Sequence, residues 1–424
     1  FAMNKEYIRL KSDALQVEVN SSTGGINFYD ATGRVLLKDK DYGTQFTPFD
    51  DAGTFSYNVR QAFLLEKDEV IYGLGQQQTG KVNQRNQKLF LRNKNMSICI
   101  PFIHSVKGYG LYWDNYSPTM FTDNPQEMSF DSEVGDCADY YFIYGSNADG
   151  VIAGVRDLTG QAPLYPLWTL GFWQCRERYK SPDELCEVVD EYRDRKVPLD
   201  GIIQDWQYWG KYGWNAMRFD ESDYPDPKVL VDSLHAMNTR LMLSVWSKID
   251  SESKIGQEMK QKGYYLANTS WVDFFNSDAA SCYWMNFSKN LLKPYGIDAW
   301  WQDATEPEND DLLRRKVMNG TVPGEVFRNV YPLLVNRTVY QGCRKDDPSR
   351  RTMILTRSGF PGIQRYGAAV WSGDVGHDWE TFRRQIVGGL NMMASGIPWW
   401  TYDAGGFFRP QDQYTDKKYH ERFL

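Results

Sequence analysis

Histidine is scarce in this chain, and its four copies lie far apart in the sequence, at His104, His235, His377 and His420. A metal site built from histidines is therefore not expected. The six cysteines show no C-x-x-C spacing, which argues against a zinc ribbon or a thioredoxin-type redox motif. No apolar run approaches the roughly 20 residues that cross a bilayer. The net charge of −7 argues against nucleic acid or an anionic membrane surface as a partner.

Aromatic residues, in contrast, are abundant. Phenylalanine, tryptophan and tyrosine together make up 15% of the 424 residues. Rings at this density can form a hydrophobic core, and they are also what a sugar-binding cleft needs, because the apolar C–H faces of a pyranose pack on them. Composition alone leaves both interpretations open. The length corresponds to two or three domains of roughly 100–200 residues each.

The N-terminal part, residues 1–160, has the pattern of an antiparallel β-sandwich. Short segments rich in β-branched and aromatic residues alternate with turn signals, and no long helical period is found. The clearest predicted strands are residues 15–19, 88–92, 96–103, 110–113 and 140–144.

From residue 161 to residue 424 the pattern changes to apolar runs that alternate with amphipathic helical stretches. Residues 181–195 begin with Ser-Pro-Asp-Glu, a good helix start. Continuous apolar strands between helices are typical of a parallel sheet covered on both faces, and so many of them favour a (β/α)8 TIM barrel. The predicted strands are residues 167–173, 201–206, 240–246, 298–303, 352–357, 368–374 and 397–403.

Most of these predicted strands end in a charged or aromatic residue, and the strand ends of a parallel barrel meet at one mouth. The residues are Trp173, Asp205, Trp246, Asp303, Arg357, Asp374 and Asp403. A pocket lined by carboxylates and aromatic rings suits three kinds of protein: a glycoside hydrolase, a divalent-metal site, or a sugar-binding protein without catalysis. No D-x-D-x-D-G loop supports the metal site.

Six segments resemble glycoside hydrolase family 31, in the order in which the family has them. Residues 300–306 resemble its nucleophile segment, residues 355–366 its arginine segment and residues 369–374 its acid/base segment. Residues 72–75, 108–110 and 395–407 also match. The resemblance implies a galactose mutarotase-like β-sandwich, a (β/α)8 barrel and a retaining α-glycosidase.

The same resemblance implies roles for individual residues. Asp303 would be the nucleophile, and Asp374 the general acid and then the base. A free aspartic acid has a pKa near 4, so this acid would need a raised pKa, which a nearby carboxylate and partial burial both favour. Arg357 would contact substrate hydroxyls, with a structural ion pair as the alternative. Asp205 would accept a hydrogen bond from the sugar, with a helix cap as the alternative.

Further residues are candidates for the walls of the pocket. Trp246 would contact the sugar, with the barrel core as an equal alternative, and Glu306 would orient Arg357 or its loop. Asp403 has a turn as its alternative role. The remaining candidate substrate-binding residues are Trp173, Phe172, Trp300 and Trp371.

Residues 172–179 resemble the α-xylosidase branch of the family, especially enzymes that act on xyloglucan oligosaccharides. Xylose lacks the hydroxymethyl group of glucose, so bulky side chains such as Phe172 and Trp173 would exclude glucose sterically. The alternatives are an α-glucosidase or α-glucosyltransferase, and, from another class, a non-catalytic sugar-binding relative. We expect an oligosaccharide substrate, no cofactor, no metal, no nucleic acid and no membrane span.

Two expectations concern the ends of the chain. Residue 1 is Phe and Met3 is not first; with a polysaccharide-type substrate, this weakly favours a periplasmic or secreted protein, and the oligomeric state stays open. The family continues into an eighth strand with an Arg-x-His-Gly segment that this chain does not contain. We therefore expect two domains, residues 1–160 and a barrel of residues 161–424 that is truncated after its seventh strand.

Overall fold

The computed structural model describes residues 2–3, 6–308 and 312–407. The chain forms two compact units. The first unit comprises residues 1–160, 325–329 and 372–424, and the second comprises residues 161–324 and 330–371. The structure thus changes units after Gly160, and it adds two later segments to the N-terminal unit.

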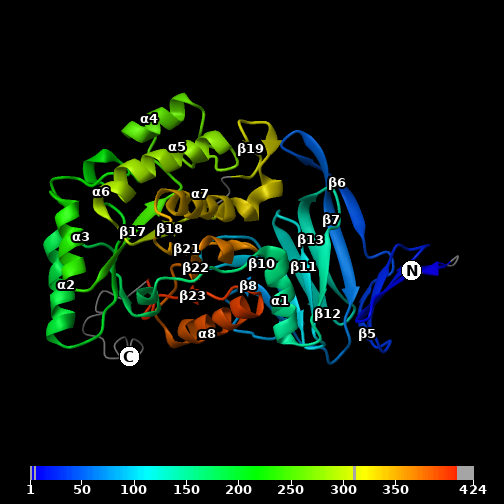
Figure 1. The fold of residues 1–424 in the computed structure, drawn as a ribbon. Coiled ribbons are helices and arrows are strands. Elements are labelled where there is room, and N and C mark those ends of the chain that lie inside the picture. Colours follow the sequence, from blue (N-terminus) through cyan, green and yellow to red (C-terminus); the bar gives the residue numbers. More distant parts are fainter. Residues whose placement is uncertain (1, 4–5, 309–311, 408–424) are drawn as a thin grey trace. The chain divides into compact units, whose positions relative to one another are not determined.

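The first unit contains the expected antiparallel β-sandwich (Figure 1). The larger sheet has the order β1-β2-β3-β4-β5-β7-β13-β12-β9, with β6 paired to β7, and the smaller sheet has the order β14-β11-β10-β8. The strands are β1 (Ala2–Met3), β2 (Tyr7–Lys11), β3 (Leu15–Asn20), β4 (Ile26–Asp30), β5 (Val35–Asp39), β6 (Gln45–Asp51), β7 (Thr54–Leu64), β8 (Ile71–Gln76), β9 (Lys88–Leu91), β10 (Ile98–Ser105), β11 (Tyr109–Trp113), β12 (Thr119–Asn124), β13 (Glu127–Gly135) and β14 (Tyr140–Tyr144).

Aromatic rings join the two sheets of the sandwich. Trp113 of β11 stacks on Phe130 of β13 with ring centroids 5.7 Å apart, and its indole N–H donates to Ser132 at 2.8 Å. Phe28 of β4 stacks on Phe142 of β14 at 4.0 Å. Part of the aromatic excess is therefore sandwich core, as the composition allows.

The β-sandwich is followed by one helix, α1 (Ala148–Thr159), within residues 1–160, where no long helical period is expected. The side chain of Asn147 caps it by accepting a hydrogen bond from the N–H of Gly150, and Val151 and Val155 are buried four residues apart. A cap followed by i, i+4 apolar spacing is a helix signal. Its short length makes this signal easy to overlook beside so many strands.

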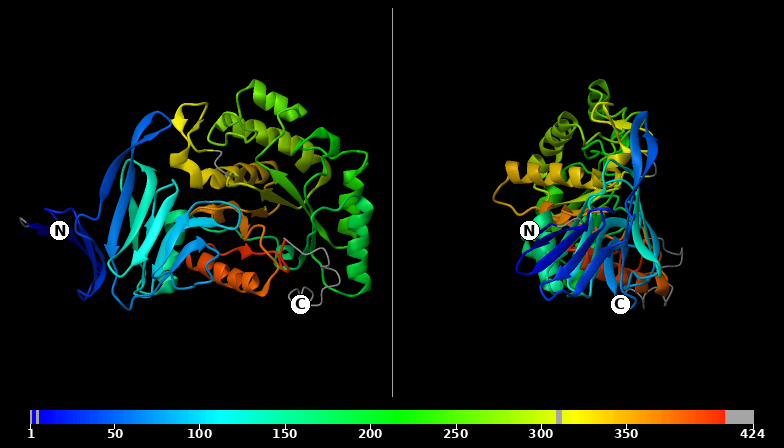
Figure 2. Two further views of the ribbon diagram at one scale, coloured as in Figure 1. Left: turned by 180° about the vertical axis from the view of Figure 1, so that it is seen from behind. Right: turned by 90° about the vertical axis from the view of Figure 1, so that its right-hand side faces the viewer.

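The second unit is built on parallel strands in the order β15-β16-β17-β18-β21-β22. These strands are β15 (Trp173–Gln174), β16 (Gly201–Gln204), β17 (Arg240–Trp246), β18 (Ala299–Asp303), β21 (Ile354–Thr356) and β22 (Ala368–Trp371). The helices of this unit are α2 (Pro182–Asp194), α3 (Pro227–Ala236), α4 (Lys254–Gln261), α5 (Ser277–Phe287), α6 (Lys293–Tyr295) and α7 (Tyr331–Asp346), and a small hairpin joins β19 (Lys316–Val317) to β20 (Val322–Pro323). Figure 2 shows α2 and α3, in green, lying side by side.

Helix α2 confirms the predicted helix start at Ser181. The hydroxyl of Ser181 accepts a hydrogen bond from the N–H of Glu184 at 3.2 Å, and Pro182 occupies the first turn. Asp183 and Glu184 place negative charge at the positive end of the helix dipole. Local sequence alone therefore fixes where this helix begins.

The predicted strand over residues 167–173 is wrong for most of its length. Leu167–Leu170 form a 3₁₀ turn, η1, and only Trp173–Gln174 pair with β16. Leu167 is 81% exposed and Leu170 is 62% exposed, so these apolar side chains do not enter a core. A short apolar run predicts burial but does not distinguish a strand from a helical turn.

The predicted strand over residues 397–403 shortens to β23 (Trp400–Thr401), which belongs to the first unit. There the N–H of Ser372 donates to the carbonyl of Thr401 at 3.2 Å. Helix α8 (Trp379–Ala394) lies between these two segments in the sequence and is part of the same unit.

Candidate active site

Asp303 is the last residue of β18, and Trp246, the last residue of β17, lies opposite it in the parallel register. Side chains of a strand alternate between two faces. Trp300 takes the other face of β18, where its ring meets Phe287 of α5 at 4.4 Å between centroids, and only 2% of Trp300 is exposed. Asp303 and Trp246 therefore point away from the helix layer, into the strand-end mouth of the sheet.

Arg357 follows β21 and lies between two carboxylates. Its Nη1 lies 3.4 Å from Oδ1 of Asp303, and its Nε and Nη2 donate to Oε1 of Glu306 at 3.0 and 2.7 Å. Only 3% of Arg357 is exposed. A buried guanidinium with several charge-assisted bonds has a fixed position, and it holds the Asp303 carboxylate in a fixed orientation.

Glu306 is 1% exposed and also accepts a hydrogen bond from the hydroxyl of Ser358 at 3.2 Å. Its contacts agree with the prediction that Glu306 orients Arg357. Glu308 adds a further contact to the guanidinium at 3.1 Å. The predicted alternative for Arg357, a structural ion pair, is thus present, and the ion pair includes the candidate nucleophile.

Asp205 follows β16 directly and is 5% exposed. Burial raises the pKa of its carboxyl group well above the usual value, and the negative charge of Asp303 raises it further. The side chain accepts a hydrogen bond from the N–H of Trp206 at 2.7 Å. The next helical element, η2 (Gly210–Tyr212), begins five residues later, so Asp205 does not cap a helix.

Four indole rings gather beyond β16 and β17, and we call Trp206, Trp209, Trp214 and Trp246 the tryptophan cluster. Trp214 lies at its centre, with ring centroids 4.8 Å from Trp246, 5.3 Å from Trp206 and 5.4 Å from Trp209. The indole nitrogens of Trp214 and Trp246 are buried and have no hydrogen-bond partner among the described residues. Aromatic faces with N–H donors left over suit a ligand rich in hydroxyl groups.

Asp374 belongs to the first unit, where Asn95 holds it at two points. The side-chain N–H of Asn95 donates to Oδ2 of Asp374 at 2.6 Å, and the backbone N–H of Asp374 donates to Oδ1 of Asn95 at 2.9 Å. Asn95 is not among the residues predicted from the sequence, since 279 residues separate it from Asp374 in the chain. No local pattern marks such a contact.

Several predicted pocket residues have other surroundings. Trp300 is packed against α5, as described above. Phe172 is 41% exposed, and its ring lies 6.0 Å from that of Tyr192 on α2. Trp173 stacks on Trp168 at 5.0 Å. Trp300 is thus part of the packing between β18 and α5, whereas Phe172 lies beside α2 with much of its ring exposed.

Trp371 is 2% exposed and meets Trp301 edge to face at 5.3 Å. Trp301 stands two residues before Asp303, on the same face of β18. Trp301 is not among the predicted pocket residues, although the period-two alternation counted back from Asp303 points to it.

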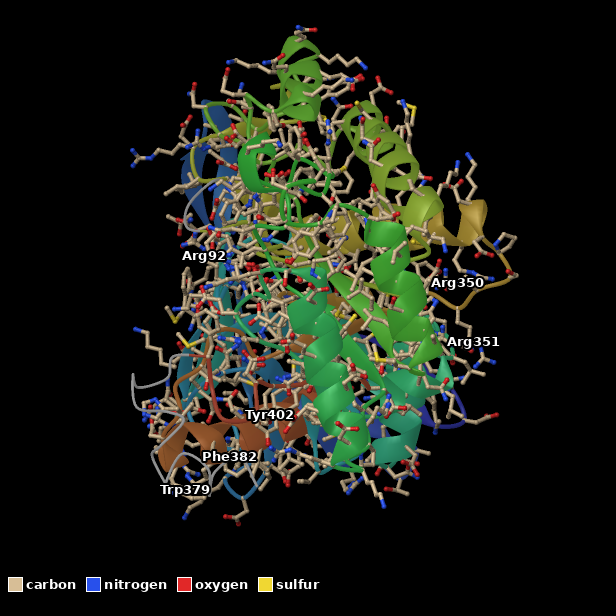
Figure 3. The ribbon with its side chains drawn as sticks, turned by 90° about the vertical axis from the view of Figure 1, so that its left-hand side faces the viewer. Arg92, Arg350, Arg351, Trp379, Phe382 and Tyr402 are labelled. Carbon is tan, nitrogen blue, oxygen red and sulfur yellow. The ribbon has the colours of Figure 1, made fainter. Side chains whose placement is uncertain are left out.

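Asp403 lines a pocket of the first unit together with His377, Asp378, Phe382 and Tyr402. Figure 3 shows Trp379, Phe382 and Tyr402 near one another, and their successive ring centroids are 6.1 and 5.8 Å apart. The carbonyl of Asp403 accepts a hydrogen bond from the N–H of Gly406 at 2.9 Å. This bond is the turn that the sequence analysis gave as the alternative role of Asp403.

The described part of the chain holds no cluster of three or more His, Cys, Asp or Glu side chains that could bind a metal ion. None of the helices found in residues 2–3, 6–308 and 312–407 is long and apolar enough to cross a membrane.

Comparison with known proteins agrees with the presence of an N-terminal β-sandwich and a parallel β-sheet with helices. Residues 162–423 match the glycosyl hydrolases family 31 TIM-barrel domain. Residues 1–131 match the glycosyl hydrolase 31 N-terminal galactose mutarotase-like domain. These two domains define a class of glycoside hydrolases, and the chain belongs to glycosyl hydrolase family 31. The resemblance inferred from the six segments and the predicted fold class are thereby confirmed.

Among its relatives, an alpha-xylosidase of Saccharolobus solfataricus is 41% identical over 98% of this chain, and the match covers 58% of that protein. An uncharacterized family 31 glucosidase of Pseudescherichia vulneris is 32% identical over 86% of this chain and 70% of its own length. A GH31 alpha-xylosidase from a soil metagenome, solved in complex with xylose, is 30% identical with a TM-score of 0.91, over 100% of this chain and 66% of its own. The chain thus spans about 58% of the first relative.

Proposed function

We propose that the protein is a retaining α-glycosidase that removes α-xylosyl residues from the non-reducing ends of oligosaccharides of the xyloglucan type. The observation that carries the proposal is the buried contact of Arg357 with Asp303 at the end of β18, inside a chain of family 31. Two alpha-xylosidases among its relatives support the choice of xylose. A family 31 glucosidase among them keeps α-glucose as the second candidate.

In this mechanism Asp303 attacks C1 of the sugar, the bond from C1 to the leaving oxygen breaks, and Asp374 gives its proton to that oxygen. In the second step the Asp374 carboxylate takes a proton from water. The water oxygen then bonds to C1 as the ester to Asp303 breaks. Two inversions at C1 return the α-anomer.

The described residues around Asp303 suit this chemistry. Arg357 fixes the carboxylate in place, so little reorganisation is needed when it attacks. The negative charge of Asp303 contributes to the raised pKa of Asp205, and the Asp205 carboxyl group offers an acceptor to a sugar hydroxyl. The tryptophan cluster offers apolar faces to the sugar ring.

The test uses the intact natural protein with 4-nitrophenyl α-xyloside and α-glucoside, in wild-type form and as Asp303→Ala. We expect faster turnover of the xyloside, an α-configured first product by NMR, and loss of nearly all turnover in the variant. Faster turnover of the glucoside would replace xylose by glucose in the proposal. Sugar binding with no turnover of either substrate would make the protein a non-catalytic relative. Substantial activity of Asp303→Ala would refute its role as nucleophile.

A further inference from the structure

The residue that holds Asp374 comes from a tight turn of the β-sandwich. Lys94 and Ser97 form a β-bridge, with N–H to O distances of 3.1 and 2.9 Å, and leave Asn95 and Met96 at the tip of the turn. The preceding Asn93 is fully buried, and its side chain accepts a hydrogen bond from the N–H of Cys99 at 2.9 Å. The turn is therefore fixed on the side that leads back into β10.

Gln76, at the end of β8, ties this turn to the segment that carries Asp374. Its side-chain N–H groups donate to the carbonyls of Met96 at 3.2 Å and Ser372 at 3.0 Å, and its oxygen accepts from the indole of Trp400 at 2.8 Å. Gln76 is 1% exposed, and these bonds use both its donors and its acceptor. The Met96 and Ser372 backbones thus have a common buried anchor.

Gly373 allows the two segments to come this close. Its φ is +83°, and a Cβ on it would lie 2.4 Å from Oδ1 of Asn95 and 2.7 Å from the N of Met96. Both distances are far inside van der Waals contact. Any larger residue at position 373 would push the Asn95 turn away from Asp374.

The hydrogen bonds also settle how the Asn95 amide is oriented. Its Oδ1 must face the backbone N–H of Asp374, because only an oxygen can accept that bond. Nδ2 therefore faces Oδ2 of Asp374 as a donor. In the protonated carboxyl group the C=O oxygen is a better acceptor than the O–H oxygen, so the bond from Nδ2 favours Oδ2 as the C=O oxygen and Oδ1 as the oxygen that carries the proton.

We propose that Asn95 is a positioning residue for Asp374: its amide fixes the plane of the carboxyl group and directs the exchangeable proton to Oδ1 in both steps of the reaction. The inference rests on the proposed function, because it assigns Asn95 to the group that gives and takes the proton. Asn95 itself touches neither sugar nor water in this role. It acts only through Asp374.

The test compares substrates that differ in their need for a proton. The leaving group of a disaccharide is a sugar alkoxide, which is poorly stabilised and needs a proton from the acid. The leaving group of a glycosyl fluoride is fluoride, which departs with little help from the acid. For Asn95→Ala in the intact protein we expect kcat/KM on the α-linked disaccharide to fall about 100-fold, within the range that general acid catalysis contributes. On the corresponding α-glycosyl fluoride we expect a loss below about 5-fold.

Asn95→Asp provides a second variant of the same shape. It keeps an acceptor for the Asp374 N–H but replaces the donor by a negative charge, so the same selective loss is expected if Asn95→Ala does not fold. Asn58→Ala is the matched control, since Asn58 is also a half-buried sandwich asparagine with one side-chain donor bond, to the Glu133 carbonyl. Both substrates should be turned over normally by that control.

Equal losses on both substrates in both Asn95 variants would overturn the inference, since they would mean general damage to the fold. Unchanged turnover of the disaccharide would overturn it as well. A wild-type protein that hydrolyses neither substrate would instead refute the proposed function, and the role of Asn95 with it. Turnover by the wild-type protein therefore tests the proposed function. The losses in kcat/KM on the two substrates, compared within each Asn95 variant, test the role of Asn95.

Discussion

Arg357 donates two hydrogen bonds to a single oxygen of Glu306, through Nε at 3.0 Å and Nη2 at 2.7 Å. Both side chains are almost fully buried, and the same guanidinium reaches Asp303. Asp303 and Glu308 also contact this guanidinium, so loss of the Glu306 charge removes two buried charge-assisted bonds but does not leave Arg357 unpaired. Loss of an exposed ion pair costs less.

Glu306→Gln should therefore lower the free energy of unfolding by about 1.5–3 kcal/mol. It should also lower kcat, because Arg357 would no longer hold Asp303 in one orientation. Glu308→Gln is the matched control, since the Glu308 side chain is 38% exposed and bonds to the same guanidinium. Its effect on unfolding should stay below about 1 kcal/mol. Equal effects of the two variants in urea unfolding would contradict this account.

The variants Trp246→Phe and Trp300→Phe test which face of the sheet binds the sugar and which packs against the helices. Trp246 lies in the tryptophan cluster opposite Asp303, so its loss should raise KM about 2- to 12-fold, the equivalent of about 0.5–1.5 kcal/mol of ring contact. Trp300 packs against Phe287, so its loss should lower the free energy of unfolding by roughly 1–2 kcal/mol without a change in KM. Steady-state kinetics and thermal unfolding of both variants check this, and a KM effect at Trp300 would reverse the assignment of faces.

Asp205→Asn should make the enzyme slower and, near neutral pH, more stable. Loss of a charged acceptor for a sugar hydroxyl should lower kcat/KM about 10- to 150-fold, the equivalent of about 1.5–3 kcal/mol. Burial and the charge of Asp303 raise the pKa of Asp205 in the folded protein above its pKa in the unfolded chain. The free energy of unfolding of the wild type therefore falls as the pH rises from the unfolded-state pKa through the folded-state pKa. The variant lacks this loss. A lower melting temperature of Asp205→Asn at neutral pH would contradict the prediction.

Asp39 gives the β-sandwich a pH dependence of its own. Burial raises the pKa of Asp39 to about 7, against the opposing hydrogen bonds from the N–H of Ile26 and the hydroxyl of Tyr140. The folded protein then keeps a proton that the unfolded chain releases near pH 4, so stability is lost between about pH 4 and pH 7, by up to about 4 kcal/mol. Asp39→Asn should remove this loss. Parallel curves of melting temperature against pH for the two proteins would refute the assignment.

Much of the site could be predicted because its signals are local. The run that became β17 is predicted over its full length, and Asp303 stands at the end of its strand as expected. The Ser181 cap and the family segments lie within a few residues each. Hydrophobic periodicity and short motifs predict features of this kind, because the residues involved are close together in the sequence.

The residues that sequence reasoning misplaced depend on contacts that no local pattern contains. Leu167 and Leu170 are apolar but exposed, so hydrophobicity alone misled the strand prediction. Trp300 is an exception, because it stands three residues before Asp303 and the period-two alternation of a strand already puts the two side chains on opposite faces. Asn95 meets Asp374 only because the fold brings a sandwich turn against a segment 279 residues later.

The turn that carries Asn95 has a consequence for the choice of expression host. Asn95, Met96 and Ser97 form an N-x-S acceptor sequence for N-linked glycosylation, and the sugar would be attached to Nδ2 of Asn95. That nitrogen lies 2.6 Å from Oδ2 of Asp374, too close for a glycan to be inserted between them. A glycan at Asn95 and the contact with Asp374 exclude each other. A secretory eukaryotic host that modifies this sequence would therefore produce a chain in which the candidate acid has lost its partner.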